Sequence, residues 1–320
     1  MARVYLKKST KTASTGSDDV RATVMGILND IESGGDSAAL EYAAKFDGYD
    51  GNLILTEAEI QVACDLVPEK LKQDIQFAHA NVKRFAEAQR GTIIDFETEI
   101  VPGLIAGQKS IPCNAAGCYI PGGRYSHIAS AIMTVTTAKV AGCQHITACS
   151  PPAKDAGIAP AIIYAAHHCG ADKILAMGGV QGVASMTFGL FGLPEADIIV
   201  GPGNQFVAEA KRLLFGRVGI DVIAGPTESA VIADDSADPA IVTADLVGQA
   251  EHGPDSPVWL ITSSRALGEQ VLALAPSLIA ALPELARQAA EAAWRDHAEV
   301  VLVDSREEAV QVSDKYACEH

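Results

Sequence analysis

The feature that most constrains the fold of this chain is a regular alternation of helix-like and strand-like runs after Tyr119. The first series predicts helices at 127–141, 157–168, 182–190 and 205–214, and strands at 145–149, 173–177 and 197–200. Strands that alternate with helices of this length predict parallel βαβ units. In such folds, ligands bind at the turns that follow the carboxyl ends of the strands.

A second series of the same kind begins near residue 220. It predicts strands at 220–223, 230–232, 258–261 and 299–303, and helices at 238–250, 266–276, 283–295 and 306–314. Ala224-Gly225-Pro226 interrupts the alternation between the two series, so we expect a domain boundary there. The sequence therefore predicts an α/β fold with one parallel-sheet domain over 119–224 and another over 225–320.

The first 118 residues carry different patterns. Capping residues and apolar periodicity predict helices within 1–90, and we expect this helical region to pack with the second domain. Residues 91–118 contain short apolar stretches broken by Pro102-Gly103, Gly107 and Pro112, which predict strands and turns.

Composition limits the functional classes. The chain has 320 residues, 48% of them hydrophobic, which suffices for two domains with cores. A net charge of −16 without a basic cluster argues against a nucleic-acid partner. The seven cysteines form no CxxC pair, which indicates reduced thiols, and no apolar run approaches membrane-spanning length. We therefore expect a soluble, cytoplasmic protein with no membrane partner.

Two glycine-bearing turns between a predicted strand and a predicted helix suit a ligand. These are Gly178-Gly179-Val180-Gln181-Gly182 and Gly201-Pro202-Gly203-Asn204. Backbone N–H groups at a helix start can bind an anion. The full G-x-G-x-x-G fingerprint is absent, and glycines at such turns are often purely geometric. A nucleotide-like ligand and a geometric role are about equally favoured.

A third turn, from Tyr119 to His127, combines Arg124 with an imidazole, two hydroxyls and a predicted helix start. This combination suits an anion, although a surface turn with Arg124 paired to a carboxylate is the simpler alternative.

Two other segments offer metal-binding or acid–base groups. Gln249 and His252 are three residues apart at a predicted helix end, so they share a face. Two donors do not make a metal site, and a His there also interacts with the helix dipole. Glu319 and His320 place a carboxylate beside an imidazole, which suits acid–base chemistry, or they form a solvated tail.

Taken together, these segments resemble the histidinol dehydrogenase family, zinc-containing enzymes that oxidise an alcohol to an acid with two NAD. The segments that carry the resemblance are Tyr119–Gly123, Gly178–Gln181, Gly201–Lys211 (GPGNQFVAEAK), Gly225–Glu228 (GPTE), Gln249–Ser256 (QAEHGPDS) and Tyr316–His320 (YACEH). The resemblance implies two Rossmann-like domains in an intertwined homodimer.

The resemblance also implies roles for single residues, with Zn2+ and NAD as cofactors. The residues are Gln249 and His252 as zinc ligands, Glu319 and His320 as the catalytic pair, Tyr119, Gln181 and Asn204 as NAD contacts, and Thr227, Gln249, His252 and His320 as substrate contacts.

The chain departs from the family pattern in two places. Residues 124–130 resemble instead the sulfopropanediol dehydrogenases. This resemblance implies oxidation of 2,3-dihydroxypropane-1-sulfonate to 3-sulfolactate, with Arg124 and His127 as the residues that hold the sulfonate. The family continues beyond His320 with an Asp and a His that complete the zinc site, so we expect a C-terminally truncated chain. The alternatives are a histidinol dehydrogenase, converting L-histidinol to L-histidine, and an inactive nucleotide-binding fragment.

Overall fold

The computed structural model describes residues 4–11, 18–122, 127–154, 156–223 and 227–320. The chain forms two compact units, which we call the large unit (Gly16–Ala224) and the small unit (Met1–Thr15 with Gly225–His320). The division between residues 224 and 225 coincides with the interruption of the predicted alternation.

The large unit is built on a five-stranded parallel sheet of order β6-β5-β4-β7-β8. Its strands are β4 (Ala115–Tyr119), β5 (His145–Ser150), β6 (Lys173–Ala176), β7 (Ile198–Val200) and β8 (Gly219–Ile220). The connecting elements are α4 (Ile128–Ala141), α5 (Pro160–Cys169), α6 (Gly179–Phe188), η1 (Leu190–Gly192) and α7 (Gln205–Leu214). Every residue of β4 is buried, as expected of a central strand covered on both faces. The predicted α/β class with parallel strands is confirmed.

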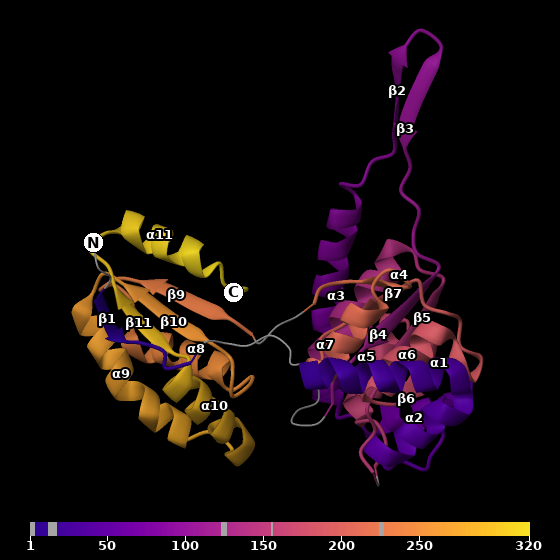
Figure 1. The fold of residues 1–320 in the computed structure, drawn as a ribbon, viewed down its shortest axis with the longest axis horizontal. Helices are drawn as coiled ribbons and strands as arrows, with labels where there is room; N and C mark the ends of the chain where they lie inside the picture. Colours follow the sequence, from indigo (N-terminus) through magenta and orange to yellow (C-terminus); the bar gives the residue numbers. More distant parts are fainter. Residues whose placement is uncertain (1–3, 12–17, 123–126, 155, 224–226) are drawn as a thin grey trace. The chain divides into compact units, whose positions relative to one another are not determined.

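The N-terminal helices belong to the large unit. They are α1 (Asp18–Phe46), α2 (Glu57–Leu66) and α3 (Glu69–Arg90). Helix α1 packs on α6 and α7, α2 packs on α5, and α3 packs on α4 (Figure 1). Ile27, Leu28 and Ile31 of α1 are buried in the same core cluster as Met186 of α6. The expected packing of this region with the second domain is therefore wrong for these helices, because their apolar faces are buried against the large unit's own helices.

The small unit has a four-stranded sheet of order β1-β11-β10-β9, in which only β1 is antiparallel. Its strands are β1 (Val4–Lys7), β9 (Ser229–Ala233), β10 (Val258–Thr262) and β11 (Glu299–Leu302), and its helices are α8 (Pro239–Ala250), α9 (Arg265–Ala280), α10 (Glu284–Asp296) and α11 (Arg306–Tyr316). Successive strand residues face opposite sides. Leu260 and Val300 therefore pack with α8, α9 and α10, whereas Ile261 and Val301 pack with α11 (Figure 1).

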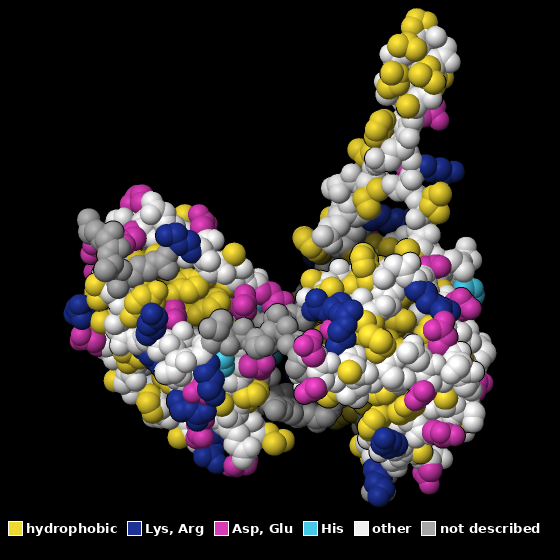
Figure 2. Space-filling model, in the orientation of Figure 1, with side chains coloured by type: hydrophobic (Ala, Val, Ile, Leu, Met, Phe, Trp, Pro, Cys, Tyr) yellow, Lys and Arg dark blue, Asp and Glu magenta, His cyan; other side chains and the backbone are white. Residues whose placement is uncertain are grey.

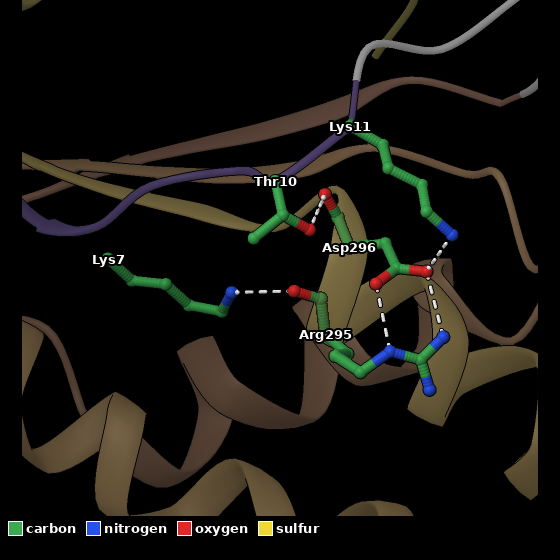
Figure 3. Close-up of polar contacts among 5 residues, drawn as sticks. All are labelled: Lys7, Thr10, Lys11, Arg295 and Asp296. Atoms are coloured by element: carbon green, nitrogen blue, oxygen red, sulfur yellow. Dashed lines mark hydrogen bonds and ion pairs between the residues drawn. The ribbon is translucent and has the colours of Figure 1, made fainter.

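Strand β1, which the sequence analysis did not predict, is tied to the end of α10 by polar contacts (Figure 3). Lys11 Nζ lies 2.7 Å from Asp296 Oδ2, and the Arg295 guanidinium donates to the same carboxylate at 2.8 Å. Lys7 Nζ donates to the Arg295 carbonyl at 3.3 Å. These contacts hold the N-terminal segment in the small unit.

The large unit also carries an antiparallel hairpin of β2 (Phe96–Val101) and β3 (Leu104–Gln108), all of whose residues are exposed. Figure 2 shows hydrophobic side chains along it. Its five large apolar residues, each more than half exposed, are Phe96, Ile100, Val101, Leu104 and Ile105. No helix in the described part of the chain has the length and apolar character needed to cross a membrane.

Candidate active site

A cavity of about 800 Å³ lies in the large unit at the turns that follow the sheet's strands. Tyr119 ends β4, Gln181 lies in the first turn of α6, and Asn204 precedes α7. All three side chains line this cavity. Its volume lies in the range of small-molecule sites. The structure thus brings together the three residues that the sequence analysis assigned to NAD, at the carboxyl edge of the parallel sheet.

Asn204 is the N-cap of α7. Its Oδ1 accepts hydrogen bonds from the backbone N–H groups of Phe206 at 3.0 Å and Val207 at 3.2 Å. An N-cap oxygen satisfies donors that the first helical turn leaves unpaired. Because the oxygen is engaged, Nδ2 is the atom that Asn204 offers to a ligand.

Tyr119 is buried, and its hydroxyl accepts a hydrogen bond from the Gly179 backbone N–H at 2.9 Å. Burial raises the pKa of Tyr119 well above its usual range, so the side chain stays a neutral phenol. Gly179 has φ +54°, a conformation that L side chains rarely adopt. A glycine therefore suits this backbone conformation at the start of α6.

Gln181 is held by a residue that the sequence analysis missed. Asp47 lines the cavity, and its Oδ2 accepts hydrogen bonds from Gln181 Nε2 and the Gly178 backbone N–H, both at 3.1 Å. Burial raises the pKa of Asp47, and these two hydrogen bonds partly oppose that shift. Asp47 follows α1, in the region assigned to the other domain, and no ligand-binding motif surrounds it in the sequence.

The turn before Asn204 is braced from inside the protein. Gly201 has φ +116°, and a Cβ there would lie 2.0 Å from the Tyr119 carbonyl oxygen, so only glycine fits. Lys211 of α7 is 3% exposed, donates to the Gly201 carbonyl at 2.9 Å and forms an ion pair with Asp221. Asp221 in turn accepts from the Gly201 N–H at 2.7 Å. The backbone N–H and the backbone carbonyl of Gly201 are therefore both held by side chains.

The predicted catalytic pair lies in the small unit, next to β9. The His320 N–H donates to the Glu228 carbonyl at 3.0 Å, and the Ala230 N–H donates to the His320 carbonyl at 2.9 Å. These bonds place Glu319 and His320, both exposed, beside the amino end of β9, and Thr227 lies two residues before this strand. The structure thus places the catalytic pair and the predicted substrate contact Thr227 at one edge.

The predicted zinc ligands approach the same edge. Gln249 lies half-buried in the last turn of α8, and exposed His252 donates its N–H to the Gln249 carbonyl at 3.2 Å. The chain then runs into β10, where the Pro257 carbonyl accepts from the Ser229 N–H at 3.1 Å. In the small unit, the candidate residues therefore gather at the amino ends of the parallel strands, not at the carboxyl ends where such folds usually bind ligands.

These residues do not by themselves fit a zinc ion. In the described ranges, no group of three or more His, Cys, Asp or Glu side chains could hold a metal. Gln249 and His252 supply two neutral donors, whereas zinc in proteins takes three or four protein ligands.

The predicted sulfonate-binding pair is only partly described. Arg124 lies outside the described residues. His127 is half-buried and immediately precedes α4 in the large unit.

The geometry defines an α/β protein with a small-molecule site at the carboxyl edge of a parallel sheet. The histidinol dehydrogenase family model matches residues 10–320, so the chain belongs to the histidinol dehydrogenase family, whose members in general depend on NAD and bind zinc. This confirms the resemblance that the sequence motifs carry.

Individual relatives refine this assignment. The chain is 67% identical to the sulfopropanediol 3-dehydrogenase of Ruegeria pomeroyi, over 99% of this chain and 73% of that protein. It is 38% identical to the histidinol dehydrogenase of Methanosarcina barkeri, over 96% of this chain and 70% of that protein. The crystal structure of histidinol dehydrogenase from Elizabethkingia anophelis superimposes with a TM-score of 0.88 at 35% identity, over 97% of this chain and 71% of that one.

Proposed function

We propose that this chain oxidises 2,3-dihydroxypropane-1-sulfonate to 3-sulfolactate with two NAD. The observation that carries the proposal is the 67% identity to a sulfopropanediol 3-dehydrogenase, against 38% to a histidinol dehydrogenase over a similar share of the chain. The difference in identity favours the sulfonate over histidinol as the substrate.

The large unit supports an NAD site. Its strand order, β6-β5-β4-β7-β8, runs outward in both directions from β4, which is the order of a Rossmann-like sheet. Such sheets bind dinucleotides at the point where the strand order reverses, here between β4 and β7. Tyr119 ends β4, and Asn204 lies in the turn after β7. We therefore assign the cavity with Tyr119, Gln181 and Asn204 to NAD.

The chemistry needs two hydride transfers. In the first, His320 removes the proton of the primary hydroxyl while NAD accepts the hydride from the same carbon, which gives the aldehyde and NADH. In the second, Glu319 takes a proton from a water molecule that attacks the aldehyde, and a second NAD accepts a hydride to give the carboxylic acid.

Substrate contacts are proposed at both ends of the molecule. Arg124 and His127 carry donors suited to a sulfonate, whereas the cationic amine of histidinol would gain nothing from Arg124. At the reacting end, the proposed contacts are Thr227, Gln249, His252 and His320.

We also propose a homodimer, intertwined as the family resemblance implies. The exposed apolar hairpin β2–β3 supports it, because a contiguous apolar surface of this kind usually marks an interaction site. Light scattering on the purified protein at several concentrations tests the proposal; a monomer at all concentrations contradicts it.

The decisive assay follows NADH formation by the purified protein, supplied with Zn2+, with each alcohol in turn. We expect two NADH for each dihydroxypropanesulfonate consumed, and a kcat/KM for L-histidinol that is lower by several orders of magnitude. A higher kcat/KM for histidinol would assign the enzyme to the histidinol branch, and inactivity with both alcohols would favour the nucleotide-binding alternative.

Zinc content is a separate test. Because Gln249 and His252 are two donors, we expect the 320-residue chain to retain well under one zinc per chain after dialysis. Elemental analysis of the dialysed chain measures this, and about one zinc per chain would show that further ligands lie within these 320 residues.

A further inference from the structure

We propose that Asp47 is a positioning residue that sets the orientation of the Gln181 amide in the cavity and so selects NAD over NADP. The inference rests on the proposed NAD site and assigns that site a residue outside the family motifs.

The hydrogen bonds of Asp47 determine which atom Gln181 can offer to a ligand. An ionised carboxylate only accepts hydrogen bonds, so Asp47 Oδ2 can pair with Gln181 Nε2 but not with its Oε1. Gln181 is 1% exposed, so its amide cannot turn freely into solvent. Within the described part of the chain, no protein donor pairs with Oε1. Gln181 therefore offers the cavity an acceptor.

Asp47 is itself fixed in place. Its backbone N–H donates to the Ala43 carbonyl at 2.8 Å. The N–H of Gly48, which has φ +60°, donates to the same carbonyl at 3.1 Å. At the other side, Asp47 also holds the Gly178 N–H, which belongs to the turn that carries Gln181. One carboxylate thus ties the end of α1 to the start of α6.

An acceptor at Gln181 selects the chemistry of its ligand. Ribose hydroxyls can donate to Oε1, whereas the oxygens of an ionised phosphate can only accept. We place the adenosine ribose of the dinucleotide beside Gln181; in NADP this ribose carries a phosphate, which adds roughly 1.5–2 negative charges near neutral pH. Asp47 is the only charged side chain among the described residues that line the cavity. The described lining therefore favours the unphosphorylated ribose of NAD.

The test measures binding, not turnover, by fluorescence titration of the complete protein with NADH and with NADPH. We expect Asp47→Asn to weaken NADH binding by about tenfold, because the neutral amide no longer fixes the Gln181 orientation. The preference for NADH over NADPH should fall by at least about tenfold, because the repelling charge is gone. Asp50→Asn is the matched control: it removes the same charge from an exposed residue three positions away that does not line the cavity, and should change neither constant.

A double-variant cycle distinguishes positioning from a general structural effect. If Asp47 acts through Gln181, then Asp47→Asn should change NADH binding less than about twofold in a Gln181→Ala background. Independent, multiplying effects in the double variant would contradict a positioning role. If Asp47→Asn does not fold, Gln181→Glu tests the same contact, because it replaces the donor to Asp47 with a second carboxylate and should weaken NADH binding at least as much.

The outcomes separate this inference from the proposed function. If the unaltered protein binds neither dinucleotide, the proposed NAD site fails and Asp47 has no such role. If it binds NADH while Asp47→Asn behaves like Asp50→Asn, the inference alone fails.

Discussion

Replacement of Lys211 tests whether the turn that presents Asn204 depends on a buried cation. Lys211 is 3% exposed and donates to both the Gly201 carbonyl and Asp221. Lys211→Met keeps most of the aliphatic volume but removes the charge and both hydrogen bonds. We therefore expect the large unit to lose stability and the Gly201 turn to lose its internal donor.

The magnitude follows from the burial of the two partners. Removing one member of a fully buried ion pair costs about 3–5 kcal/mol, because the other charge is left unpaired. The Asp221 side chain is 30% exposed and keeps the Gly201 and Val222 N–H groups as donors, so part of that cost is avoided. We expect Lys211→Met to lower the free energy of unfolding by about 2–3 kcal/mol.

Urea unfolding followed by circular dichroism measures this change, with the transition of the large unit analysed separately from that of the small unit. With a slope of about 2–3 kcal/mol/M, the midpoint should fall by about 1 M. Lys83→Met is the control, since Lys83 is 52% exposed and its pair with Glu87 spans 4.0 Å; it should change stability by less than about 0.5 kcal/mol.

Two outcomes decide the argument. If the cost comes from an unpaired Asp221, then Lys211→Met combined with Asp221→Asn should be more stable than Lys211→Met alone. If Lys211→Met is as stable as Lys83→Met, the buried pair does not support the turn.

Three further changes probe the proposed chemistry and the small unit. His320→Ala should abolish alcohol oxidation but retain oxidation of supplied aldehyde, whereas Glu319→Gln should chiefly impair the aldehyde step; loss of both steps in His320→Ala would contradict this division. Arg124→Ala should raise KM for the sulfonate by about one to two decades with little change in NAD affinity, and unchanged sulfonate kinetics would exclude Arg124 from the site. The Arg295 and Lys11 side chains hold the pKa of Asp296 below its usual range, so its stabilising contribution is present above the unfolded pKa of about 3.9 and is lost as pH falls further. Asp296→Asn should therefore lower stability at pH 7 more than at pH 3 in urea unfolding, and an equal loss at both would contradict the ionic origin.

Local sequence signals were sufficient to predict an element whose formation depends on the residues within it and next to it. The helix predicted at 205–214 has those bounds in the structure, because Asn204 caps it and its apolar residues repeat at helical spacing. The family resemblance grouped Tyr119, Gln181 and Asn204 as NAD contacts. All three line the cavity, because each lies at or after the carboxyl end of a strand of one parallel sheet.

Features that depend on distant partners could not be predicted in this way. Asp47 and Gln181 are 134 residues apart, and nothing near Asp47 in the sequence indicates its partner. Strand β1 has four residues and acquires its strand geometry from pairing with β11. Thr227 and His320 likewise lie near each other at the amino end of β9 because the His320 backbone forms hydrogen bonds with Glu228 and Ala230, which are distant in the sequence.

The pairing of β1 with β11 has a consequence for biosynthesis. Val4 is opposite Leu302, and the whole large unit lies between them in the sequence. At about 5–20 residues per second on the ribosome, β1 waits roughly 15–60 s for its partner strand, whereas the large unit can fold during that interval. Strand β1 therefore emerges before the large unit, and the sheet of the small unit can be completed only after translation has passed β11. A circular permutant that joins β1 to the end of the chain would remove this wait.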